Sequence, residues 1–135
     1  MTPKELRERT ADFAARVEAF SRPLLKRIET REAALQLSRS SSSVASNYRA
    51  AGRSRSHAEF TAKLGTVLEE ADESQFWLEH LRRCGLVTAE QAKPLLAEAD
   101  ELVAIFTKAN QTAQHREKNK NARPPGHPSK PRRRP

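Results

Sequence analysis

The chain has 135 residues, a formal net charge of +8 and a single cysteine, Cys84. This length is enough for one domain with its own hydrophobic core, and one cysteine excludes an internal disulfide framework. No run of about eighteen apolar residues occurs and the N-terminus is charged, so we expect a cytoplasmic protein with no signal peptide and no membrane span.

The positive charge is concentrated near the C-terminus. Residues 112–135 hold eight Lys/Arg and one Glu, which leaves 17 basic and 16 acidic residues in 1–111. Within those residues the charge divides again, because 1–55 has a net charge of +6 and 56–111 a net charge of −5. The sequence therefore predicts a body with a basic half and an acidic half, followed by a basic segment.

The first predicted helix begins at the N-terminus. Thr2 can cap it, Pro3 suits its first turn, and Glu5 can complete a capping box. Side chains at spacings of three and four residues then form one face: Leu6, Thr10, Phe13, Val17 and Phe20. Because Pro23 lacks an N–H and disfavours the helical conformation of the residue before it, we expect this helix to end near Ser21.

The second stretch, LSRSSSSVASNYRAAGRSRS, has the composition of a disordered arginine/serine linker. On a helix, however, Leu37, Val44, Tyr48 and Ala51 fall within an arc of about 60°. An arc of about 80° on the nearly opposite side holds Arg39, Ser42, Ser46, Arg49 and Arg53. A linker has no reason to sort its residues in this way, so the pattern predicts a helix over residues 31–52.

The third predicted helix follows Ser56 and ends at Cys84 and Gly85, where arginines in the last turn suit the helix dipole. Its apolar face keeps the same rhythm: Phe60, Leu64, Val67, Ala71, Ser74, Leu78 and Leu81.

The fourth predicted helix begins after Thr88, which can form a capping box with Gln91. Its face consists of Leu95, Ala99, Leu102, Phe106 and Ala109. Pro94 predicts that residues 89–93 form a separate turn or a kinked start. Four amphipathic helices, short connections and no strand pattern predict an all-α fold, an antiparallel four-helix bundle over residues 1–111.

The last segment, 112–135, contains five of the eight prolines and no Val, Ile, Leu, Met or aromatic residue. Such a sequence cannot bury enough apolar surface to offset the entropy of ordering it. We expect a disordered, basic, Pro-rich tail.

Four blocks of the chain resemble a known family in their order: RTADFAARV, LSRSSSSVASNYRAAGRSRSHAEFTAKLG, EEADESQFWLEHL and EADELVAIF. The family is one of four-helix bundles that includes proteins encoded by intervening sequences in bacterial 23S ribosomal RNA genes. It is also similar to the accessory proteins of diversity-generating retroelements. One departure is Ala50, since the family often carries an acid after the NYR motif.

The resemblance implies a helical bundle, a homopentamer, and a reverse transcriptase or another protein as a possible partner. It implies no biochemical activity, because most members have no known function.

Catalytic and metal sites are poorly supported. Glu69, Glu73 and His80 share one side of the third helix, but a diiron bundle uses Glu-x-x-His pairs from two helices, which this chain lacks. No phosphate-binding glycine loop occurs, and no nucleophile has a partner base at a recognisable spacing. We expect no enzyme activity, no metal and no cofactor.

Two hypotheses of function remain. In the first, an oligomeric adaptor binds the backbone of RNA or DNA through a basic face and basic tails. The candidate residues are Arg39, Arg49, Arg53, Arg55, Lys130, Arg132, Arg133 and Arg134.

In the second hypothesis, the protein is an interaction scaffold without RNA specificity. Its arginine face is then occupied by an acidic strip of the third helix, either in the same bundle or in a neighbouring subunit. The candidate interface residues are Glu69, Glu73, Phe76 and Trp77. The alternative reading of that strip is an ordinary solvated helix face.

Overall fold

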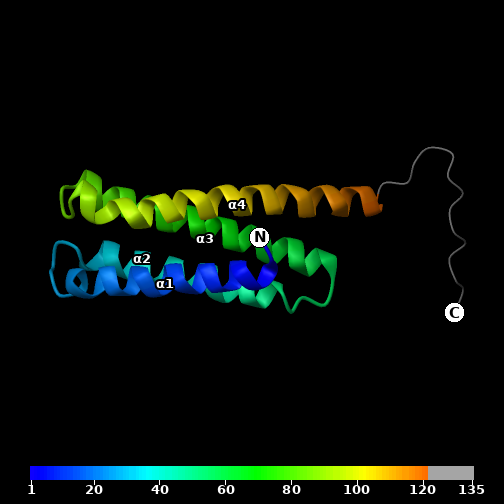
Figure 1. The fold of residues 1–135 in the computed structure, drawn as a ribbon, viewed down its shortest axis with the longest axis horizontal. Helices are drawn as coiled ribbons and strands as arrows, with labels where there is room; N and C mark the ends of the chain where they lie inside the picture. The colour runs from blue at the N-terminus through cyan, green and yellow to red at the C-terminus, as the bar shows by residue number, and fades with distance from the viewer. Residues whose placement is uncertain (122–135) are drawn as a thin grey trace, which may run out of the picture.

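The computed structural model describes residues 1–121, which form four helices in chain order (Figure 1). These are α1 (Pro3–Leu25), α2 (Arg31–Ala51), α3 (His57–Arg83) and α4 (Ala89–Asn121). Successive helices run in opposite directions, and the described residues contain no strand. The expected all-α, antiparallel four-helix bundle is confirmed.

The core is built from the helix faces that the spacing of apolar residues predicts. α2 packs against α1 and α3, and α3 packs against α2 and α4, whereas α1 and α4 contact each other least. The largest fully buried apolar side chains are Phe13, Val17, Leu37, Val44, Leu64, Val67, Leu78, Leu81, Leu102 and Phe106. Every helix therefore contributes to one continuous core. None of the helices described here is both long enough and apolar enough to cross a membrane.

The serine-rich stretch is helical, as its two faces predict. Ser40 and Ser41 are buried in α2, and the hydroxyl oxygens of Ser40 and Ser74 lie 2.8 Å apart across the contact between α2 and α3. Small side chains let these two helices approach closely, and each hydroxyl also contacts a carbonyl of its own helix. The serines thus serve as small, hydrogen-bonded core residues.

The predicted helix starts are also confirmed. Thr2 and Glu5 form the reciprocal capping box of α1, and Thr88 and Gln91 form the corresponding pair before α4. Gly85, after the end of α3, has a positive φ of 71°, a conformation that glycine adopts without steric cost.

Two expectations based on proline are wrong. α1 continues through Pro23 to Leu25 rather than ending near Ser21. The missing N–H of Pro23 removes one hydrogen bond, and the helix ends only two residues later. The hydroxyl of Thr30 donates to the Leu24 carbonyl at 2.5 Å. α4 likewise begins at Ala89 and continues through Pro94, so residues 89–93 do not form a separate turn.

The expected boundary between bundle and tail is too early. α4 runs past Gln111 to Asn121, so residues 112–121 are helical rather than disordered. The cause is Ala113, which is 3% exposed and belongs to the core, and whose carbonyl lies 3.0 Å from Nε2 of His57. The remainder of the expected tail, 122–135, lies outside the described residues, as do Lys130, Arg132, Arg133 and Arg134.

Candidate nucleic-acid interface

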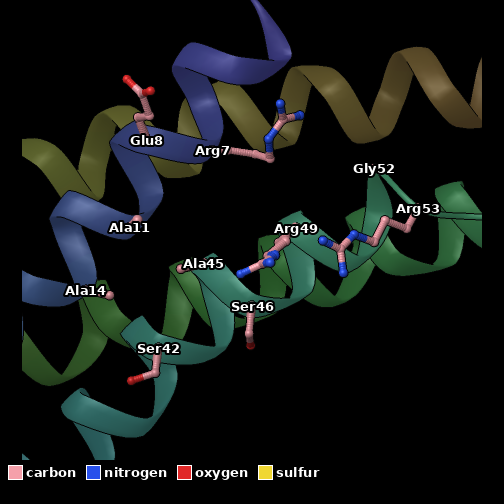
Figure 2. Close-up of a pocket in the computed structure, with 10 residues that line it drawn as sticks. All are labelled: Arg7, Glu8, Ala11, Ala14, Ser42, Ala45, Ser46, Arg49, Gly52 and Arg53. Carbon is pink, nitrogen blue, oxygen red and sulfur yellow. The ribbon is translucent and has the colours of Figure 1, made fainter.

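An open groove runs between α1 and α2, and its volume is about 870 Å³ (Figure 2). This volume is large enough for a segment of a polymer rather than for a single ion. α1 contributes Arg7, Glu8, Ala11 and Ala14, and the remaining lining residues are Ser42, Ala45, Ser46, Arg49, Gly52 and Arg53. Small side chains form most of the lining, and three arginines are gathered toward one end, as Figure 2 shows. We call this surface the arginine groove.

The arginines come from α1, from the end of α2 and from the connection that follows it. Arg49 lies in the last turn of α2, and Arg53 follows the C-cap residue Gly52, just beyond the end of the helix. Arg7 approaches from α1, since a Cβ added at Gly52 would lie 3.9 Å from Nη1 of Arg7. Its guanidinium therefore lies near the C-terminal end of α2, where the helix dipole favours a cation.

Tyr48 lies beneath this end of the groove. Its ring packs against Phe106 of α4 with 5.4 Å between the ring centroids. Burial raises the pKa of the Tyr48 hydroxyl, and the positive charge of Arg7 acts in the opposite direction. Tyr48 thus supports the end of the bundle where Arg7 and Arg49 lie.

The charges of the arginine groove are not neutralised by ion pairs. In residues 1–121, salt bridges involve Arg9, Arg27 and Arg82, and none involves Arg7, Arg49 or Arg53. Glu8 is the single acidic residue among those lining the groove. The groove consequently presents three exposed guanidinium groups to solvent.

A second surface lies on the outer side of α3, and we call it the acidic strip: Glu69, Glu70, Asp72, Glu73 and Phe76. Phe76 is 55% exposed, which is unusual for a large apolar side chain. Its ring lies 4.9 Å from that of Trp77 and stacks on His80 at 5.7 Å.

Two further contacts define this surface. The indole N–H of Trp77 donates to Glu73 at 3.3 Å, and Trp77 is partly buried against the core. Burial raises the pKa of the Glu70 carboxyl, and the neighbouring Glu73 and Glu69 raise it further. The expected pairing of this strip with α2 of the same bundle is not seen, because no salt bridge within residues 1–121 joins the two helices.

The sequence profile of the 23S rRNA-intervening sequence protein family matches residues 4–108. The chain belongs to this family. A similar solved structure is that of a protein of unknown function from the S23 ribosomal protein family of Bacteroides thetaiotaomicron. It shares 27% sequence identity, covers 82% of this chain and 99% of its own chain, and superposes with a TM-score of 0.76. No curated protein matches the chain.

The structure brings together only part of the predicted basic face. Arg49 and Arg53 line the arginine groove, whereas Arg39 and Arg55 are exposed outside it. Arg7 was missed by the sequence analysis. The signal was the spacing of Arg7, Ala11 and Ala14, which places them on one side of α1 beside its buried face.

A partly buried ion pair joins α1 to α4. Nε and Nη2 of Arg9 donate to the two carboxylate oxygens of Glu98 at 2.8 and 2.6 Å, and Nη2 also contacts Glu101. The bond from Arg9 holds the pKa of Glu98 below its usual range, and the carboxylates raise the pKa of Arg9. This cluster stabilises the bundle where α1 and α4 otherwise make few contacts.

The described part of the chain offers no evident metal centre. Among residues 1–121, no group of three or more His, Cys, Asp or Glu side chains could hold a metal ion. Cys84 is exposed and lies 3.7 Å from Nε2 of His80, one turn earlier in the chain.

Proposed function

We propose that this protein binds the phosphate backbone of nucleic acid, RNA in the first instance, through the arginine groove. The observation that carries the proposal is the convergence of Arg7, Arg49 and Arg53 on one open groove, with no salt bridge to a carboxylate within residues 1–121. Guanidinium groups bind phosphate oxygens in a bidentate manner, and they do so without sequence preference. Small lining residues allow a backbone to approach these cations closely.

The position of α4 supports the same assignment. α1 begins and α2 ends at the end of the bundle beyond which α4 projects (Figure 1). The projecting part of α4 carries Arg116 and Lys118, both exposed. Exposed Arg55 in the connection between α2 and α3 adds to the charge at this end. The cations of the groove and of α4 could thus contact one strand of RNA together, and the basic sequence of 122–135 follows directly.

Salt dependence measures how many phosphates the groove contacts. Each neutralised phosphate contributes about −0.9 to the slope of log K against log[salt] on a duplex and about −0.7 on a single strand. Three groove arginines would account for a slope of about −2 to −3.

The test is the affinity for a structured RNA hairpin as a function of salt, for the full chain and for a variant that ends at Asn121. In the shortened protein, Arg49→Ala should reduce the magnitude of the slope by about one and weaken binding of unrelated hairpins equally. Arg31→Ala is the matched control, because Arg31 is an exposed α2 residue at the opposite end of the helix.

A second outcome of the same experiment would refute the proposal. If binding disappears with residues 122–135 and Arg49→Ala changes nothing, the groove is not the RNA site. The protein would then be an interaction scaffold, and a protein partner such as a reverse transcriptase would be the next candidate.

A further inference from the structure

One face of α3 has no partner within residues 1–121. Phe76 is 55% exposed, and its ring lies 4.9 Å from the ring of Trp77. The carboxylates of the acidic strip, which contains Phe76, form no salt bridge with any other described residue. An exposed ring beside carboxylates suits a ligand rich in guanidinium groups, because these groups pair with carboxylates and also stack on aromatic rings.

The sequence that follows the described residues has this chemistry. Residues 122–135, ARPPGHPSKPRRRP, contain four arginines, one lysine and no acidic residue, and three of the arginines are adjacent at 132–134. The five prolines restrict the backbone in advance, so binding this segment costs less entropy than binding a glycine-rich one. We propose that the acidic strip of α3 binds residues 132–134 of the same chain.

The length of the segment permits this contact. The end of α4 projects beyond the start of α3 (Figure 1), and Nε2 of His57 lies 3.0 Å from the Ala113 carbonyl. At about 1.5 Å per helical residue, Asn121 lies about 12 Å beyond this contact and Glu69 about 18 Å on its other side, so about 30 Å separate them along the bundle. Arg132 follows Asn121 by eleven residues, and an extended chain of that length spans up to about 36 Å.

Attachment to the same chain favours this occupant. A short linker holds a segment at an effective concentration of about 1 mM, so a contact too weak to form between separate molecules is populated within one chain. The arginine groove does not compete for the segment, because three of its four charged lining residues are arginines. Phe76 distinguishes the strip from other acidic surfaces, since it is the one aromatic residue among the large apolar side chains exposed in residues 1–121.

The consequence of this contact rests on the proposed function. RNA and α3 would compete for residues 132–134, so the segment would be withheld from RNA until it is displaced from the strip. If the segment occupies the strip about nine-tenths of the time, its release should raise the RNA affinity of the full chain by up to about tenfold.

The test uses Trp77, the single tryptophan of the chain, as the reporter. In the full chain, Cys84→Ser removes the native thiol, and Pro135→Cys provides the attachment point for a nitroxide label, which quenches tryptophan fluorescence only at short range. At low salt the label should quench Trp77 to an extent that is independent of protein concentration. Salt at about 1 M should abolish the quenching, because it screens exposed ion pairs.

Charge reversals identify the two sides of the contact. Glu69→Arg combined with Asp72→Arg should abolish the quenching, since both carboxylates are exposed on the strip. Adding the reversals Arg132→Glu, Arg133→Glu and Arg134→Glu to that variant should restore it, because the charge pairs are rebuilt with their signs exchanged.

Two further variants complete the test. Phe76→Ala should reduce the quenching while leaving the fold intact, since this side chain is largely exposed. Glu18→Arg combined with Glu90→Arg is the matched control, because both residues are exposed outside the strip, and it should have no effect. An unquenched Trp77 in the labelled full chain, quenching that grows with protein concentration, or quenching that persists after the strip is reversed would each overturn the proposal.

Binding of a structured RNA hairpin separates this proposal from the proposed function. Glu69→Arg with Asp72→Arg should raise the RNA affinity of the full chain more than that of a variant that ends at Asn121, which lacks the segment. Quenching that responds to the charge exchange in a chain that binds no RNA would sustain the contact and refute the proposed function. RNA binding through Arg49 in a chain without quenching would do the reverse.

Discussion

The hydrogen bond between Ser40 and Ser74 allows a direct test of why a serine-rich stretch folds as a core helix. The two hydroxyl oxygens are 2.8 Å apart in the contact between α2 and α3, and both side chains are buried. The perturbation is a double-mutant cycle of Ser40→Ala, Ser74→Ala and the double variant. Ser42→Ala is the control, because Ser42 is exposed on the same helix.

The expected size follows from what each substitution leaves behind. After Ser40→Ala, the hydroxyl of Ser74 still lies 2.9 Å from the Glu70 carbonyl, so it keeps one partner and loses one. A lost hydrogen bond of this kind costs about 0.5–1.5 kcal/mol, partly offset by about 0.5 kcal/mol of better helix propensity for alanine. The control removes an exposed hydroxyl that donates to the Ser38 carbonyl of its own helix, so it should show no cost from the contact between α2 and α3.

The double variant should cost less than the two single variants together, because only one bond joins the hydroxyls. We expect a coupling energy of about 0.5–1 kcal/mol. Urea unfolding followed by far-UV circular dichroism measures all four free energies, provided that the m-values agree. If each single variant matches the Ser42→Ala control, or if the single effects simply add, the serine pair does not hold α2 against α3 and the reasoning is refuted.

Three other predictions concern stability. Because Arg9 lowers the pKa of Glu98, the Glu98 carboxylate stabilises the fold above its unfolded pKa and loses this effect as pH falls through the folded pKa. Glu98→Gln should therefore lower the free energy of unfolding by about 1 kcal/mol at pH 7 and by nothing at strongly acid pH. Urea unfolding at each pH measures this difference. Ending the chain at Gln111 removes buried Ala113 and should lower the melting temperature, whereas ending it at Asn121 should not. Gly85→Ala should destabilise by about 1 kcal/mol, since φ is positive there, and an unchanged thermal midpoint would contradict this.

The helices themselves were largely predictable. Periodic apolar spacing and capping residues are local properties, and they located α2 even through a run of serines. The errors arose where a local rule was applied without its context. α1 continues two residues past Pro23, because the proline removes only one hydrogen bond close to the helix end. Residues 112–121 extend α4, and Ala113 in this extension is buried against the core.

The candidate surfaces could not be predicted from the sequence alone, because they depend on which helices pack together. The order of residues was enough to indicate four amphipathic helices and a basic and an acidic half, because periodicity and charge are written along the chain. It could not indicate that Arg7 lies beside Arg49 and Arg53, since this requires knowing that α1 packs against α2 and in which register. Nor could it indicate that, within residues 1–121, the acidic strip forms no salt bridge with α2. Pairing of charges depends on distances between helices, and packing of the core sets those distances.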